Sequence, residues 1–302
     1  TAQKLNQHQW QAQALGKNLS IENIPQNESL QSLAIVNPAS NSDIVGHLQE
    51  ATATQVNQAL ENAVNAQSEW SNTAKNTRAA CLQRAADIMQ SRLPDLMILL
   101  CRESGKTYSN AIAEVREAID FLRYYAAQVI DLENDTIIQP LGTVLCISPW
   151  NFPLAIFAGQ ISAALVAGNT VIAKPAEQTP LIAAVQLLLG QGETVGAQLS
   201  SDARIQGIMF TGSTEVAKIL QKTLAQRLSS SGQSVPLIAE TGGQNAMIVD
   251  SSALTEQVVL DVVSSAYDSA GQRCSELRVL CVQEDNADSV ISMLKGAMGQ
   301  LR

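Results

Sequence analysis

Apolar residues recur at helical spacing through two long stretches in the first half of the chain. Ala59 and Ala63 are examples between residues 55 and 90, and residues 112–130 repeat the spacing. Because side chains three and four positions apart share one face of a helix, the pattern predicts long amphipathic helices. Residues 1–30 are polar and rich in Gln and Asn. This composition predicts a peripheral helix and a loose connection.

Residues 141–173 contain no charged side chain, a length that would ordinarily indicate a membrane span. Pro149 and Pro153 interrupt the run and break it into separate elements. These elements are a strand, a helix and a strand, at residues 143–147, 154–167 and 170–173. Parallel strands covered on both faces are continuously apolar, so we interpret the run as a buried βαβ unit and expect no membrane span.

Helices and strands continue to alternate after this unit. The pattern predicts helices at 181–189, 215–227 and 254–270, and strands at 207–210, 236–239, 246–250 and 278–283. Such a βα rhythm is typical of an α/β fold with a doubly wound parallel sheet.

Composition narrows the possible functions. With 302 residues, 46% of them hydrophobic, the chain can bury a large core. A net charge of −9 argues against nucleic acid or anionic lipid as a partner, because both require a basic surface. Five cysteines without a CxxC pair, and only two histidines, indicate reduced thiols and no metal site. The first residues do not resemble a secretory signal, so we expect a cytoplasmic protein with a small-molecule substrate.

Cys274 is the cysteine with the clearest chemical context. It follows a predicted helix and lies beside Arg273, and a nearby cation favours the nucleophilic thiolate. The other four are expected to be small buried hydrophobic residues, namely Cys81, Cys101, Cys146 and Cys281.

Polar residues follow several predicted strands, and strand ends are where open α/β sheets bind ligands. Glu240 precedes Thr-Gly-Gly at one such end, although it could be an ordinary solvated glutamate. Lys174 and Glu177 follow another strand and could hold ribose hydroxyls or form a surface pair. Gly212 and Ser213 lie where a strand meets a helix, a natural site for a pyrophosphate. Alternatively, the serine or the threonine after it simply caps the helix.

Five short motifs follow one another along the chain. They are Trp-Asn-Phe-Pro from Trp150, Lys-Pro-Ala-Glu-Gln-Thr-Pro from Lys174, Phe-Thr-Gly-Ser-Thr-Glu from Phe210, Glu-Thr-Gly-Gly from Glu240 and Gly-Gln-Arg-Cys from Gly271. Together they resemble the aldehyde dehydrogenase superfamily over most of the chain. The longer sequence segments around Glu240 and Cys274 resemble the glutamate γ-semialdehyde (pyrroline-5-carboxylate) dehydrogenase module of bifunctional proline utilisation A proteins.

The resemblance implies roles for three residues in catalysis. Cys274 would attack the aldehyde carbon, and the Asn151 side-chain amide would hold the oxyanion of the thiohemiacetal together with the Cys274 backbone N–H. NAD would accept the hydride, and Glu240 would activate the water that hydrolyses the thioester. This chemistry requires no metal.

The resemblance also implies a cofactor site, although the G-x-G-x-x-G fingerprint is absent from the sequence. The implied NAD contacts are Ser148, Pro149, Trp150, Lys174, Glu177, Gly212 and Ser213. Glu177 would favour NAD over NADP, because a carboxylate near the adenosine ribose repels a 2′-phosphate. Arg273 is the candidate for binding the substrate carboxylate, with packing or tuning of the thiol as the alternative.

The implied architecture is an aldehyde dehydrogenase-like α/β fold. We expect a peripheral segment at 1–30, a Rossmann-like NAD-binding domain with leading helices at 31–240, and the start of a catalytic domain at 241–302. The connection between Pro180 and Gly207 is shorter than in the family by on the order of a dozen residues. The remaining catalytic domain, the arm used for homo-oligomer assembly and a proline dehydrogenase module would lie outside this chain.

The implied function is NAD-dependent oxidation of L-glutamate γ-semialdehyde, formed from pyrroline-5-carboxylate, to L-glutamate in proline catabolism. Two alternatives remain open. The chain could be a truncated, non-catalytic NAD-binding fragment, or an aldehyde dehydrogenase for another semialdehyde such as succinate semialdehyde.

Overall fold

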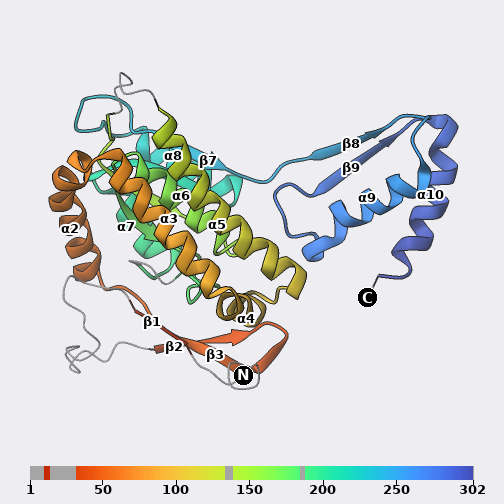
Figure 1. The fold of residues 1–302 in the computed structure, drawn as a ribbon, viewed down its shortest axis with the longest axis horizontal. Helices are drawn as coiled ribbons and strands as arrows, with labels where there is room; N and C mark the ends of the chain where they lie inside the picture. Colours follow the sequence, from red (N-terminus) through yellow and green to blue (C-terminus); the bar gives the residue numbers. More distant parts are fainter. Residues whose placement is uncertain (1–9, 14–31, 133–138, 184–187, 302) are drawn as a thin grey trace. The chain divides into compact units, whose positions relative to one another are not determined.

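The computed structural model describes residues 10–13, 32–132, 139–183 and 188–301. The chain forms two compact units, Thr1–Glu240 and Thr241–Arg302. The strands of the first unit are β1 (Trp10–Gln13), β2 (Ser32–Asn37), β3 (Ser40–Gln49), β4 (Thr143–Ile147), β5 (Thr170–Lys174), β6 (Ile205–Thr211) and β7 (Leu237–Glu240). Its helices are α2 (Ala53–Asn72), α3 (Lys75–Ser91), α4 (Leu93–Ser104), α5 (Tyr108–Asp131), α6 (Ala155–Val166), a π-helical turn (Gly192–Gly196), α7 (Ala197–Ser201) and α8 (Thr214–Leu224) (Figure 1).

A parallel sheet with the strand order β5-β4-β6-β7 forms the centre of this unit. One core cluster joins α3, α5 and α6, and another joins α2, α7 and α8 to sheet residues such as Leu145 and Ile208. Helices therefore pack on both faces, which confirms the predicted α/β fold with a parallel sheet. The chain leaves β4 toward β5 and then returns to β6 on its other side. This reversal places a topological switch point, where α/β sheets bind ligands, at the carboxyl ends of β4 and β6.

The uncharged run is a strand, a helix and a strand, as predicted. Central β4 is buried over most of its length because it lies between two neighbouring strands and two helical layers. The helix α6 has 12 residues and contributes Phe157 and Val166 to the core. Among the described residues, no helix is long and apolar enough to cross a membrane.

The structure confirms long helices in the two predicted stretches and differs from the prediction in two other places. The stretch from 55 to 90 is two helices, because Thr73 and Ala74 adopt extended backbone and the Thr73 N–H bonds back to Trp70 O. Helix α4 was not predicted. Of the helix expected at 181–189, residues 181–183 and 188–189 are not helical, and 184–187 lie outside the described residues.

The N-terminal prediction also needs correction. Trp10–Gln13 is a strand that pairs in parallel with β3, whereas a peripheral helix was expected. The other residues of 1–30 lie outside the described part of the chain. Strands β2 and β3 form an antiparallel hairpin through register pairs such as Leu33 with Leu48. The pairing of β1 with β3 joins segments distant in sequence, which a local composition argument does not detect.

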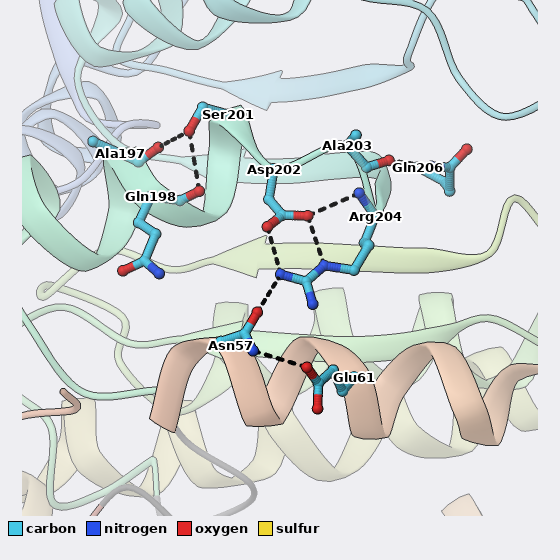
Figure 2. A network of polar contacts seen from close by, with 9 residues as sticks. All are labelled: Asn57, Glu61, Ala197, Gln198, Ser201, Asp202, Ala203, Arg204 and Gln206. Atoms are coloured by element: carbon cyan, nitrogen blue, oxygen red, sulfur yellow. Dashed lines mark hydrogen bonds and ion pairs between the residues drawn. The ribbon is translucent and has the colours of Figure 1, made fainter. Parts of the chain in front are cut away.

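The short connection into β6 is fixed by polar contacts (Figure 2). Asp202 accepts hydrogen bonds from Arg204 at both carboxylate oxygens, at 2.9 and 2.7 Å. The same guanidinium donates to Asn57 Oδ1 of α2 at 2.8 Å. Earlier in this connection, the Leu188 N–H donates to Ala173 O, so the chain runs beside the outer edge of β5. The connection is therefore an ordered part of the fold where the structure describes it.

Glu103 of α4 is a buried carboxyl that predicts an unusual pH dependence of stability. Its oxygens accept the N–H groups of Leu181 and Ile182 at 2.6 and 2.9 Å. Burial outweighs these bonds and raises the pKa from 4.5 to about 8. The folded state then holds a proton that the unfolded state has lost, so this contribution to stability is present below pH 4.5 and lost as the pH rises toward 8.

We therefore expect Glu103→Gln, which cannot ionise, to flatten the dependence of melting temperature on pH between about 5 and 8. Thermal unfolding of both proteins across that range tests this. An unchanged slope in the variant would assign the pH dependence to other groups.

The second unit contains β8 (Asn245–Val249), α9 (Thr255–Tyr267), a 3₁₀ turn (Asp268–Gly271), β9 (Leu277–Val282) and α10 (Glu284–Met298). The two strands are parallel, and one face of them packs against both helices through residues such as Val249 and Val290. Cys281 lies on the other face and is exposed. Cys81 is exposed as well, so the prediction of burial is wrong for both, whereas Cys146 is buried as expected.

Candidate active site

The predicted site residues of the first unit lie at the carboxyl ends of four adjacent parallel strands. Asn151 follows β4, Lys174 ends β5, Ser213 follows β6 and Glu240 ends β7. Backbone bonds join these ends in pairs. Ser148 N donates to Lys174 O at 3.2 Å, and Gly212 N donates to Glu240 O at 3.1 Å.

Lys174 and Glu177 form a pair that is partly enclosed by the protein. The lysine is 2% exposed, and its Nζ donates to Pro175 O at 3.1 Å and to Glu177 Oε2 at 3.3 Å. Burial opposes ionisation of the glutamate, but its own backbone N–H and the Lys174 ammonium together hold its pKa below the usual value. The geometry argues against a simple surface pair, since an ordinary surface lysine would not be buried.

The junction between β6 and α8 has its own structural explanation. Ser213 Oγ accepts the N–H of Val216 at 3.2 Å, which is the N-cap arrangement left open by the sequence. Gly212 is required sterically, because a Cβ there would lie 2.6 Å from the Phe210 ring. Its N–H already donates to Glu240 O. The Ser213 hydroxyl and the Gly212 N–H are therefore already engaged within the protein. A pyrophosphate role at this junction depends mainly on the remaining N–H groups at the N-terminus of α8.

The turn after β4 carries the other predicted contacts. Ser148 is 4% exposed, and its Oγ has no hydrogen-bond partner within the described structure. A buried hydroxyl without a partner is unusual and is consistent with a ligand that supplies one. Trp150 is 40% exposed, and its carbonyl accepts a bond from Thr179 Oγ1 at 3.4 Å. Pro149 and Asn151 lie on either side of this tryptophan.

Cys274 lies in an exposed turn of the second unit, just before β9. Asn245 Nδ2 donates to Cys274 O at 2.7 Å and to Glu276 O at 2.8 Å, so one side chain holds both ends of the turn. The preceding Ser269 and Ala270 have left-handed backbone, with φ of 53° and 54°. Non-glycine residues adopt this conformation only when their surroundings impose it.

Arg273 makes its hydrogen bonds within its own unit. Its Nη2 donates to the carbonyls of Ser264 and Ser265 at 3.0 and 3.1 Å, near the end of α9. Its Nη1 lies 3.7 Å from Asp268 Oδ2. An arginine at a helix C-terminus satisfies orphan carbonyls, so this geometry favours the packing alternative over binding of substrate.

Sequence reasoning missed several residues near these segments. Two of them are Asn245 and the fully buried Glu276, whose Oε2 lies 3.2 Å from Arg278 Nη2. The sequence around them contains no pattern that separates them from ordinary residues in or beside a strand.

A hollow of about 610 Å³ follows one face of α5. It is lined by Ala113, Arg116, Glu117, Asp120, Phe121 and Tyr124. Burial, followed by the charge of Glu114, raises the pKa of Glu117. No cluster of three or more potential metal ligands occurs among the described residues.

Known proteins resemble this chain in both sequence and structure. It is 61% identical over 283 residues to the bifunctional protein PutA of Klebsiella aerogenes, an alignment covering 89% of this chain and 22% of that protein. It is 34% identical over 294 residues to 1-pyrroline-5-carboxylate dehydrogenase of Anoxybacillus flavithermus, covering 88% of this chain and 57% of the relative.

A solved 1-pyrroline-5-carboxylate dehydrogenase from Thermus with bound NAD has a TM-score of 0.84 at 32% identity, over 91% of this chain and 58% of that one. A proline utilization A structure with proline bound in remote sites has a TM-score of 0.78 at 47% identity, over 84% of this chain and 28% of that one.

The chain thus spans about a fifth of the PutA relative and a little over half of the dehydrogenase relatives. The family model for the aldehyde dehydrogenase family matches residues 25–302, nearly the whole sequence. By this match and these identities, the chain belongs to the aldehyde dehydrogenase family.

Proposed function

We propose that this chain carries the NAD-binding part and the nucleophile of an enzyme that oxidises L-glutamate γ-semialdehyde to L-glutamate. The observation that carries the proposal is the gathering of Asn151, Lys174, Glu177 and Glu240 at one edge of a parallel sheet, in a chain whose relatives are named 1-pyrroline-5-carboxylate dehydrogenase. Residues 31–240 would form the cofactor domain, and residues 241–302 would begin the catalytic domain.

Each proposed catalytic residue has a definite task. The Cys274 thiolate attacks the aldehyde carbon and forms a C–S bond, and the Asn151 amide donates to the resulting oxyanion. NAD, when bound, accepts the hydride. Glu240 then takes a proton from a water molecule while the oxygen of that water attacks the thioester carbonyl carbon. The C–S bond breaks, which releases glutamate and the free thiol of Cys274. Glu240 and Cys274 are both exposed, as this exchange with substrate and water requires.

Lys174 and Glu177 are the proposed contacts to the adenosine ribose, and Ser148 is a further polar contact to the cofactor. The residues fit such a group, because the buried Ser148 Oγ lacks a partner and the Lys174 ammonium is held beside a carboxylate. Pro149 and Trp150 would line the cofactor, and the N-terminus of α8, at Gly212 and Ser213, would face the pyrophosphate.

Cofactor choice gives a direct test of Glu177. A carboxylate here would repel the 2′-phosphate of NADP, so we expect Glu177→Ala to shift the ratio of kcat/KM for NAD over NADP about 10-fold toward NADP. Glu193→Ala, which removes an exposed glutamate of the same unit, is the control. An unchanged ratio in Glu177→Ala would remove this residue from the cofactor site.

The proposed substrate implies a partner module that produces it. Because relatives are bifunctional PutA proteins, we propose that a proline dehydrogenase module supplies pyrroline-5-carboxylate, which opens in water to the semialdehyde. Homo-oligomer assembly stays a prediction from the family.

The deciding experiment compares NADH formation from pyrroline-5-carboxylate and from succinate semialdehyde, in the complete protein that carries this chain and in the 302-residue chain alone. A clear preference for pyrroline-5-carboxylate supports the proposal, and equal rates would reject the narrower substrate. Turnover by the complete protein, with NAD binding but no turnover by the isolated chain, would identify the chain as a cofactor-binding part.

A further inference from the structure

The helix that follows Asn151 is capped by a residue from another helix. The N-cap Leu154 makes no side-chain capping bond, and the first turn of α6 contains no acidic residue. Glu114 of α5 fills this role, because its Oε1 accepts the N–H of Leu154 at 2.8 Å and that of Ala155 at 3.3 Å. A carboxylate at this position satisfies orphan N–H groups and complements the helix dipole.

Lys106 completes a buried network on the same turn. Its Nζ lies 2.9 Å from Glu114 Oε2, and the two side chains are 8% and 0% exposed. The same ammonium lies 4.4 Å from the centre of the Phe152 ring, within the range of a cation–π contact. Phe152 directly follows Asn151. The pair therefore contacts the turn through Phe152 and again through the backbone of Leu154.

The local chain geometry places Lys106 for these contacts. Gly105 ends α4 with φ of 68°, a left-handed conformation that glycine adopts without strain. Thr107 then caps α5 by accepting the Asn110 N–H at 3.3 Å. Lys106 lies between these two caps, so both neighbours restrict its backbone.

We propose that Lys106 and Glu114 are positioning residues for Asn151, which fix the turn so that the amide is held ready for the oxyanion. The inference rests on the proposed function of Asn151. Oxyanion donors act because they are held in place before charge develops, and a misplacement of about 1 Å can cost about 100-fold in rate. Neither residue is assigned a contact with substrate.

The test uses p-nitrophenyl acetate without cofactor, in the complete protein. Cys274 Sγ attacks the ester carbonyl, p-nitrophenolate leaves with the electron pair of the broken C–O bond, and water hydrolyses the acetyl thioester. An oxyanion develops at the carbonyl oxygen, so ester hydrolysis requires the donor but neither NAD nor the natural aldehyde. Alkylation of Cys274 by iodoacetamide also requires the thiolate. It forms no oxyanion, however, and so does not require the oxyanion donor.

We expect Lys106→Met, which keeps chain length and loses the charge, to lower kcat for the ester about 10- to 100-fold. The rate of alkylation of Cys274 should stay the same. Glu114→Gln retains an oxygen for the Leu154 N–H and should give a smaller loss; it also serves if Lys106→Met does not fold. Glu103→Gln is the matched control, because it changes an equally buried glutamate that accepts two backbone N–H groups elsewhere. It should change ester hydrolysis less than about twofold.

A double variant separates positioning from general stability. If Lys106 acts through Asn151, adding Lys106→Met to Asn151→Ala should cause no further loss of ester hydrolysis. Additive losses, or a lower melting temperature with unchanged ester hydrolysis, would overturn the inference. A protein that hydrolyses the ester in this pattern but does not oxidise pyrroline-5-carboxylate would support the inference and reject the substrate proposal.

Discussion

Replacement of Cys274 by alanine is expected to abolish NADH formation, with a fall in kcat of about 10⁴-fold or more, because no other group is proposed to form the covalent intermediate. The side chain is exposed in a turn, so the substitution should change the free energy of unfolding by less than about 0.5 kcal/mol. NAD affinity should stay the same, since the proposed cofactor contacts all belong to the first unit. Steady-state assays with isothermal titration of NAD measure both quantities.

Two exposed cysteines provide matched controls for this result. Cys81 and Cys281 are exposed, like the proposed nucleophile, but neither lies in a turn before a strand. Alanine at either position should leave turnover within about twofold of wild type. Substantial NADH formation by the Cys274→Ala protein would mean that hydride transfer does not require a thiohemiacetal at this residue.

The central βαβ unit could be predicted because burial on both faces leaves a direct record in sequence. Residues 144–147 of β4 and 171–173 of β5 are all apolar, and the prolines after β4 mark where the chain turns. The polar residues that follow each strand could then be assigned to one edge of the sheet, since parallel strands share an end. The motif resemblance added roles that the pattern alone did not supply.

Two buried acidic residues of the first unit could not be predicted in the same way. Glu103 and Glu114 occur in amphipathic helices, where an acidic residue usually marks the solvated face. Their burial depends on which backbone N–H groups the neighbouring loops present, and that depends on the tertiary packing. The exposure of Cys281 likewise follows from a strand face that no helix covers in the second unit, which the alternation of its residues does not reveal.

Glu240 gives the second large effect, at a different step of the reaction. Glutamine cannot accept a proton from water, so Glu240→Gln should slow hydrolysis of the thioester about 10²- to 10⁴-fold. Attack by Cys274 and hydride transfer do not require this proton acceptor. The variant should therefore release about one equivalent of NADH per Cys274 thiol in a rapid phase and then nearly stop.

Rapid mixing at 340 nm, combined with mass spectrometry of the intact protein, distinguishes this mechanism from a simple loss of activity. A trapped thioester appears as an added acyl mass that Cys274→Ala should lack. Glu69→Gln, at an exposed glutamate on α2, is the matched control and should turn over normally. If Glu240→Gln instead slows the first phase without acyl accumulation, its carboxylate acts before hydride transfer. Deprotonation of the thiol would then be its main task, and water activation would belong to another group at this edge of the sheet.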